Sequence, residues 1–134
     1  MNIGFRVDSS DKIGTGHINR CLTLAENFKL KGFNNIFISR NDNGNINYKI
    51  KEKNFFICKL GKKKLNISVD AKKTCEFIKK FNIQFLLIDN YSINLEWEKQ
   101  VSNYCKIILI NDLLMRKTFC DYFINYHKLK LSKK

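Results

Sequence analysis

Residues 2–26, NIGFRVDSSDKIGTGHINRCLTLAE, contain the pattern that decides the fold. Residues 2–7 form a short apolar run, and the turn residues after it predict a buried strand that ends in a loop. Between 17 and 31, apolar residues recur at helical spacing, which predicts an amphipathic helix closed by Gly32 at its C-cap. The stretch therefore predicts a strand, a loop and a helix, which is the first half of a βαβ unit.

The same alternation continues along the chain. Helical periodicity predicts helices at 69–81 and 94–104, and the stretch 40–54 fits either a loop or a short helix. Apolar runs predict five further strands, at 35–39, 55–60, 84–89, 106–111 and 120–125. This order predicts an α/β fold: a Rossmann-like, mainly parallel sheet with right-handed crossovers and helices on both faces.

Polar residues follow the strands of this predicted sheet. Ligands of open α/β sheets bind beyond the carboxyl ends of the strands, so we expect these residues to line one rim. They are Asp8, Ser9, Ser10, Gly14, Gly16 and His17 after the first strand, Asp89, Asn90 and Tyr91 after the fourth, and Asn111, Asp112 and Arg116 after the fifth.

The turn IGTGH, residues 13–17, excludes two common phosphate motifs. A dinucleotide fingerprint needs a third glycine and a shorter loop, and a Walker loop needs a lysine after its last glycine. What remains is a glycine turn that opens a helix whose N-terminus favours negative charge. That terminus disfavours the imidazolium form of His17, which favours a general base, but a helix-capping or surface histidine fits the pattern equally well.

The net charge of +13 would suit nucleic acid, anionic lipid or a phosphorylated small molecule. However, the lysines are scattered, and Lys, Asn, Ile and Phe are over-used together while proline is absent, as an A/T-rich coding sequence produces. We therefore expect no nucleic-acid partner. A nucleic-acid-binding domain stays as a hypothesis that ranks third, after the two functions given below.

The five cysteines are an odd number without a C-x-x-C pair, and they are Cys21, Cys58, Cys75, Cys105 and Cys120. This pattern predicts buried free thiols in a reducing, cytoplasmic compartment, with no metal site. The N-terminus is too short and polar for a signal peptide, and runs such as FLLI cannot cross a bilayer. We expect a soluble protein without membrane insertion.

Three segments in order carry a resemblance to a known family: FRVDSSDKIGTGHINRCLTLAE (5–26), LLIDNYSINLEWE (86–98) and IILINDLLMRKTFCDYFIN (107–125). Together they resemble the N-terminal half of the UDP-2,4-diacetamido-2,4,6-trideoxy-β-L-altropyranose hydrolases of pseudaminic acid biosynthesis. The first segment is the most specific, because F-R-x-D-x-S and I-G-x-G-H-x-x-R-x-L occur together in it. The resemblance implies one lobe of a glycosyltransferase-B (GT-B) fold, with the active site between two Rossmann-like lobes.

The resemblance also implies roles for residues. His17 would activate the water that displaces UDP from the anomeric carbon of a UDP-linked amino sugar, without a cofactor or metal. Two residues depart from the family motifs, Asn90 in place of histidine and Asn111 in place of aspartate. Asp8, Asp89 and Asp112 also fit a simpler role, because each ends a strand, and this weakens a mechanism through paired carboxylates. The expected substrate-binding residues are Asp8, Ser10, Gly14, Thr15, Gly16, Arg20, Asp89, Tyr91 and Asp112.

The resemblance divides the chain into a Rossmann-like lobe, 1–126, and a basic tail, 127–134, expected to be a truncated linker to a second lobe. Because that lobe would hold the uridine, we expect the 134-residue chain alone to be inactive or weakly active. The alternative is a non-catalytic binding or assembly module that pairs with a separate nucleotide-binding lobe of a glycosyltransferase.

Overall fold

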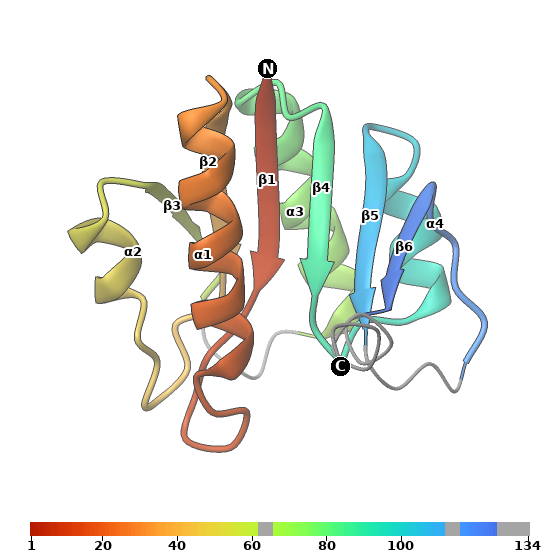
Figure 1. Ribbon diagram of the computed structural model, residues 1–134. Helices are drawn as coiled ribbons and strands as arrows, with labels where there is room; N and C mark the ends of the chain where they lie inside the picture. Colours follow the sequence, from red (N-terminus) through yellow and green to blue (C-terminus); the bar gives the residue numbers. More distant parts are fainter. Residues whose placement is uncertain (62–65, 112–115, 126–134) are drawn as a thin grey trace.

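The computed structural model describes residues 1–61, 66–111 and 116–125 of the chain, and of Asn111 and Asn125 it describes the backbone. These residues contain a six-stranded, parallel sheet in the order β3-β2-β1-β4-β5-β6 (Figure 1). The strands are β1 (Asn2–Val7), β2 (Asn34–Ser39), β3 (Phe56–Lys59), β4 (Phe85–Asp89), β5 (Lys106–Asn111) and β6 (Tyr122–Asn125). The predicted parallel α/β sheet is confirmed.

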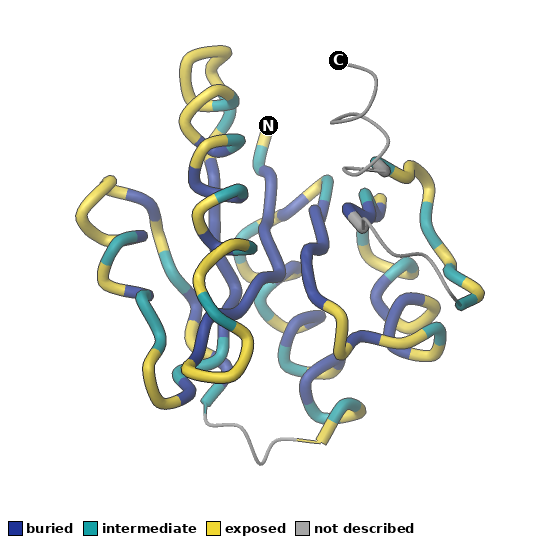
Figure 2. The backbone as a smooth tube through the Cα atoms, turned by 60° about the horizontal axis from the view of Figure 1, so that its bottom comes forward, coloured by how far each residue is buried: buried dark blue, intermediate teal, exposed yellow. Residues whose placement is uncertain are grey.

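Helices cover both faces of the sheet, also as predicted. α1 (Gly16–Leu30) and α2 (Tyr48–Glu52) pack on one face, in a core that contains Phe5, Phe37 and Leu87. α3 (Ile67–Lys80) and α4 (Leu95–Val101) pack on the other face, in a core that contains Ile38, Ile88 and Trp97. The inner strands β1, β2 and β4 are almost entirely buried, whereas the edge strands β3 and β6 expose side chains such as Phe56 and Tyr122. The outer faces of the helices are exposed (Figure 2).

Local interactions explain where two helices end. After α1, Gly32 adopts a φ of +88°, and the N–H of Phe33 donates to the carbonyl of Phe28, so Gly32 stops the helix one residue after the C-cap. α4 ends at Val101, earlier than the predicted 104. Ser102 Oγ and Asn103 Nδ2 donate to backbone carbonyls of α4, and such side-chain bonds compete with helix propagation.

Cysteine burial follows the prediction in part. Cys21, Cys58 and Cys75 are buried free thiols, whereas Cys105 and Cys120 are half-buried. Burial raises the pKa of the Cys58 thiol to about 11 and that of Cys105 to about 12, so both thiols stay protonated at neutral pH.

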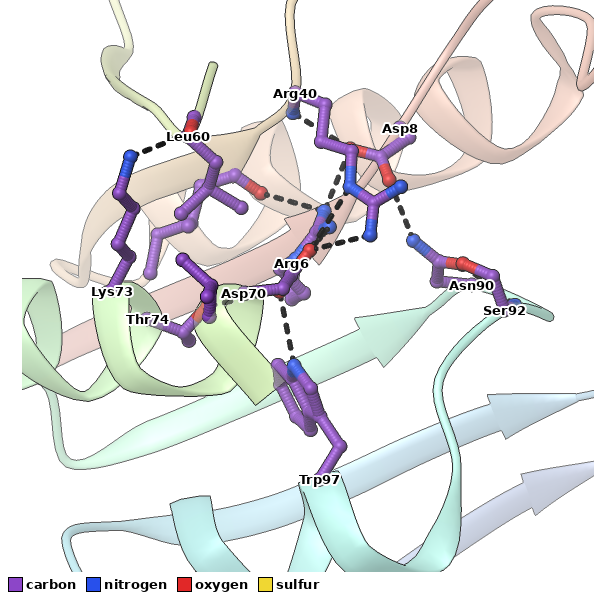
Figure 3. Close-up of polar contacts among 12 residues, drawn as sticks. Arg6, Asp8, Arg40, Leu60, Asp70, Lys73, Thr74, Asn90, Ser92 and Trp97 are labelled. Carbon is purple, nitrogen blue, oxygen red and sulfur yellow. Dashed lines mark hydrogen bonds and ion pairs between the residues drawn. The ribbon is translucent and has the colours of Figure 1, made fainter. Parts of the chain in front are cut away.

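The apolar character predicted for residues 2–7 misses one charge at the centre of the molecule. Arg6 on β1 is completely buried, with Nη1 2.7 Å from Asp8 Oδ1 and Nη2 2.7 Å from Asp70 Oδ2 (Figure 3). Asp70 lies in the first turn of α3 and also accepts hydrogen bonds from Arg40 Nε at 3.0 Å and Trp97 Nε1 at 3.0 Å. This charged cluster joins β1, the end of β2, α3 and α4.

Electrostatic compensation makes the cluster tolerable inside the protein. Burial alone would raise the pKa of the Asp70 carboxyl, but the charge of Arg6, hydrogen bonds from Arg6 and Trp97, and the charge of Arg40 together hold it below its usual range. Asp70 is therefore ionised at neutral pH, and Arg6 keeps a full set of partners.

Replacing Asp70 by Asn should strongly destabilise the protein. The substitution leaves the buried Arg6 guanidinium with one carboxylate fewer, and breaking such a pair costs about 3 to 5 kcal/mol of unfolding free energy. Urea denaturation at pH 7 measures the loss. The control is Glu26→Gln, whose side chain is 49% exposed and pairs with Lys53, with an expected loss below about 1 kcal/mol. Equal losses in the two variants would contradict the role assigned to the cluster.

The stability should also depend on pH in a defined direction. Because the pKa of Asp70 is lower in the folded protein, its contribution is complete above the unfolded value of about 4 and is lost as the pH falls below it. We expect the unfolding free energy of the unmodified protein to fall more steeply below pH 4 than that of Asp70→Asn. Parallel curves from urea denaturation between about pH 2 and 6 would refute this assignment.

Candidate functional site

The centre of the rim lies between two neighbouring strands that are far apart in the sequence. β1 and β4 pair in parallel with Val7 opposite Asp89, so the residues after both strands meet at one edge of the sheet. The chain runs outward from β1 to β3 and returns to β4 on the other side of β1 (Figure 1). Ligands of open α/β sheets bind at such a reversal of strand order.

His17 and Asp89 meet at this point. His17 is the second residue of α1 and Asp89 the last of β4, and His17 Nδ1 lies 2.5 Å from Asp89 Oδ1. The exposed fraction of the side chain is 14% for His17 and 1% for Asp89. A carboxylate at Nδ1 favours the tautomer with its proton on Nδ1, which leaves Nε2 as the acceptor.

Arg20, one helical turn after His17, also contacts Asp89. Its Nε lies 2.8 Å from Oδ2 and its Nη2 2.6 Å from Oδ1, so two nitrogens of the guanidinium face the same carboxylate. Cys21 Sγ lies 3.8 Å from Oδ2, and burial, followed by the Asp89 charge, raises the pKa of the Cys21 thiol well above its usual value. Arg20, expected at the substrate, contacts the carboxylate that holds His17.

Tyr91 forms the outer side of the site. Its ring centroid lies 4.8 Å from that of His17 with an 83° angle between the planes, and 54% of the residue is exposed. The rings stand beside a cavity of about 280 Å³. The cavity is lined by Asp8, Lys12, Ile13, His17, Asp89, Asn90, Tyr91 and Ser92.

The loop between β1 and α1 shapes the opposite side of the rim. Gly14 has a φ of +80°, which strongly favours glycine, and its N–H donates to the carbonyl of Ser10. Ser10 Oγ accepts from the N–H of Ile13 at 3.0 Å, so this hydroxyl holds the loop. Thr15 is the exposed N-cap residue of α1, yet its side chain makes no capping hydrogen bond.

Gly16, unlike Gly14, is not required by the backbone conformation. A Cβ atom at Gly16 would meet nothing within 4 Å, and its φ lies outside the left-handed region. Neither packing nor backbone conformation therefore requires glycine here. A hydrogen in place of a side chain leaves the N-terminus of α1 open to close approach by a ligand.

Hydrogen bonds of Asp8 and Asn90 stabilise the rim. Asp8 Oδ1 accepts from Arg6 and from the N–H of Arg40 at 2.8 Å, while Oδ2 accepts from Asn90 Nδ2 at 2.8 Å (Figure 3). Asn90 Oδ1 accepts from the N–H and the hydroxyl of Ser92 at 2.9 and 2.7 Å. Asn90, the departure from the family motif, thus closes the turn that carries Tyr91.

Three expected rim residues, those after β5, have other outcomes. Asp112 lies outside the described residues, and of Asn111 only the backbone is described. Arg116 donates from Nη1 and Nη2 to Glu98 at 3.1 and 2.9 Å, and the buried Glu98 carboxylate also accepts from the N–H of Phe119. Arg116 therefore fixes the segment before β6 to α4.

Sequence reasoning missed three cavity-lining residues, Lys12, Ile13 and Ser92. Lys12 and Ile13 stand inside the glycine-containing loop, and the 42% exposure of Ile13 is unusual for its residue type. The sequence signal that could have indicated Ile13 was an apolar residue within a polar loop. Within the described part of the chain, no three His, Cys, Asp or Glu side chains are grouped to hold a metal ion. Among the same residues, no helix has the length and apolarity needed to cross a membrane.

Comparison with known proteins shows similarity in fold. No protein-family model and no curated protein matches the sequence. A Rickettsia africae glycosyltransferase structure matches 87% of this chain with a TM-score of 0.65 and 18% identity. Acinetobacter baumannii MurG matches 98% with a TM-score of 0.68 and 10% identity. The chain spans 31% and 39% of those two proteins.

A third structure, of a different kind of enzyme, is also similar in fold. The dTDP-glucose 4,6-dehydratase from Bacillus anthracis, solved in complex with NAD, matches 90% of this chain with a TM-score of 0.51 and 16% identity, and the match spans 42% of that protein. At these identities the likeness establishes the fold, which is a Rossmann-like lobe of the GT-B type.

Replacing Asn90 by Ala should loosen the turn after β4. The variant removes the donor to Asp8 Oδ2 and the acceptor for Ser92, and leaving a buried acceptor such as Asp8 Oδ2 unpaired costs about 1 to 3 kcal/mol of unfolding free energy. Asn103→Ala, at an exposed side chain, should change it by less than about 0.5 kcal/mol. Urea denaturation of both variants tests this, and an Asn90→Ala loss no larger than the control would argue against the bracing role.

Proposed function

We propose that the chain is the N-terminal lobe of a UDP-sugar hydrolase. The substrate is a UDP-linked 2,4-diacetamido-2,4,6-trideoxy sugar of pseudaminic acid biosynthesis. The observation that carries the proposal is the contact of His17 with Asp89 beside a small cavity at the reversal of strand order. The proposed reaction needs a general base beside the sugar, and the sequence motif G-T-G-H, which resembles the hydrolase family, supplies a histidine for that role.

In the proposed reaction, Nε2 of His17 accepts a proton from water. The water oxygen bonds to the anomeric carbon while the bond from that carbon to the diphosphate oxygen breaks, and UDP leaves with the electron pair. Diphosphate is a good leaving group, so the protein chiefly supplies a positioned water, one base and groups that balance negative charge. Asp89 keeps the Nδ1 proton in place and orients the ring, which leaves Nε2 as the acceptor.

The size and lining of the cavity support its assignment to the sugar part of such a substrate. Its volume of about 280 Å³ is at the lower end of small-molecule sites and suits a monosaccharide better than a whole sugar nucleotide. Exposed Tyr91 and Ile13 offer apolar surface to the 6-deoxy carbon and the acetamido methyl groups. The diphosphate would approach Gly14, Thr15 and Gly16, where the N-terminus of α1 favours negative charge.

A second lobe completes this proposal. The chain spans 31% and 39% of the two glycosyltransferase-type structures that it matches. We assign the uridine and the rest of the diphosphate to another Rossmann-like lobe, on the same polypeptide or on a separate one. The same observation favours the alternative, a non-catalytic module that pairs with the nucleotide-binding lobe of a glycosyltransferase.

His17→Asn should abolish UDP release. Loss of the base is expected to lower the rate by about 100-fold or more. The assay measures UDP released from the UDP-linked sugar by the chain alone and by the chain with the C-terminal lobe of a family hydrolase added in trans. The control is His127→Asn, at the only other histidine of the chain, which should keep the rate.

Other outcomes of this assay distinguish the hypotheses. UDP release that survives in His17→Asn would refute the assigned base. Stable binding of a Rossmann-like partner lobe without UDP release would favour the assembly module. Retarded migration of DNA or RNA, with an affinity that falls steeply with salt, would favour the nucleic-acid hypothesis instead.

A further inference from the structure

Arg20 occupies an unexpected place for an arginine at the rim of a diphosphate site. Two of its nitrogens contact Asp89, at 2.8 Å from Nε to Oδ2 and 2.6 Å from Nη2 to Oδ1. Its side chain is 16% exposed, and Nη2 lies 3.4 Å from His17 Nδ1. The guanidinium therefore contacts both oxygens of the carboxylate that holds the imidazole.

The charges around His17 give this contact a consequence. Asp89 is the negative group in contact with the imidazole, and the single positive charge of Arg20 balances it. The Cys21 thiol and the Tyr91 ring are the neutral neighbours, because burial keeps the thiol protonated. Lys12 and Asp8 also line the cavity, and Asp8 is already bound to Arg6, Arg40 and Asn90.

We propose that Arg20 is a positioning residue for His17 and acts through Asp89. By holding both carboxylate oxygens, Arg20 fixes Oδ1 against Nδ1, and by balancing the charge of Asp89 it keeps the imidazole neutral, with Nε2 able to accept a proton. The use of that neutral imidazole as a base rests on the proposed function. The arrangement of the three side chains does not depend on it.

The sign of the effect follows from the charges. With Arg20 present, protonating His17 gives the three side chains a net positive charge in a half-buried place. Without Arg20, the same proton creates a neutral His17–Asp89 ion pair, which favours imidazolium. Loss of Arg20 therefore raises the fraction of His17 that already carries a proton on Nε2 and cannot act as the base, although every atom of His17 is still present.

The experiment reads the charge of His17 directly by NMR of ¹⁵N-labelled protein at pH 7. The imidazole nitrogen shifts report the ratio of imidazolium to neutral imidazole, and His17→Asn identifies the His17 signals. We expect Arg20→Gln to raise the ratio about tenfold or more. Arg20→Lys restores the charge and should return most of the ratio.

A matched control separates the position of the charge from its mere loss. Arg40 is 12% exposed and its Nη2 lies 2.9 Å from Asp70 Oδ2, so Arg40→Gln removes the same charge from a similar ion pair on another carboxylate. The ratio in Arg40→Gln should match that of the unmodified protein. An equal rise in Arg20→Gln and Arg40→Gln would overturn the proposal, as would no rise in Arg20→Gln.

A double variant provides a second test. Arg20→Gln with Asp89→Asn removes both charges while it keeps the side-chain shapes, and the ratio should return to that of the unmodified protein. A ratio that stays high would overturn the proposal, and if Arg20→Gln alone does not fold, the double variant and Arg20→Lys still decide it. No substrate enters this experiment. Absent UDP release with the expected ratios would refute the proposed function and leave the role of Arg20 intact.

Discussion

The parallel register of β1 and β4 is the constraint on which the rim depends. It places Val7 opposite Asp89, so the loop that leads to His17 and the turn that carries Tyr91 begin side by side. Each strand leads to only one of these two parts of the site. β1 is followed by β2 on one side, whereas β4 is followed by β5 on the other side. The connections after these two strands therefore diverge, and this leaves a crevice between the carboxyl ends of β1 and β4.

Two arginine–aspartate contacts support this arrangement at different depths. Arg6 and Asp70 are fully buried, and they tie the centre of the sheet to α3 and α4. Arg20 and Asp89 lie at the edge, where His17 shares the carboxylate. Asp8 links the two levels, since it accepts from Arg6 inside and from Asn90 at the rim. Apolar residues could replace the inner contact in principle, but they could not connect the core to the turn after β4.

The sequence was informative where the signal was periodic and short-ranged. Apolar runs predicted every strand, and the G-T-G-H turn predicted where α1 begins. Pairings between residues far apart in the sequence were not predictable. Arg6 pairs with Asp70, 64 residues away, and no local sequence feature of either residue indicates the other as its partner. The same holds for Arg20 with Asp89 and for Arg116 with Glu98, because a charged residue looks alike on a solvated face and in a buried pair until the topology is known.

The site also shows why a histidine at a helix N-terminus is not by itself a base. The ring must also be held with one nitrogen open to the cavity, and the Asp89 carboxylate does this by contacting Nδ1. That carboxylate is buried and is itself held by a second side chain, because Arg20 contacts both of its oxygens. Arg20 stands one turn along the same helix, so the spacing H-x-x-R carries the chemistry that the glycine turn alone does not.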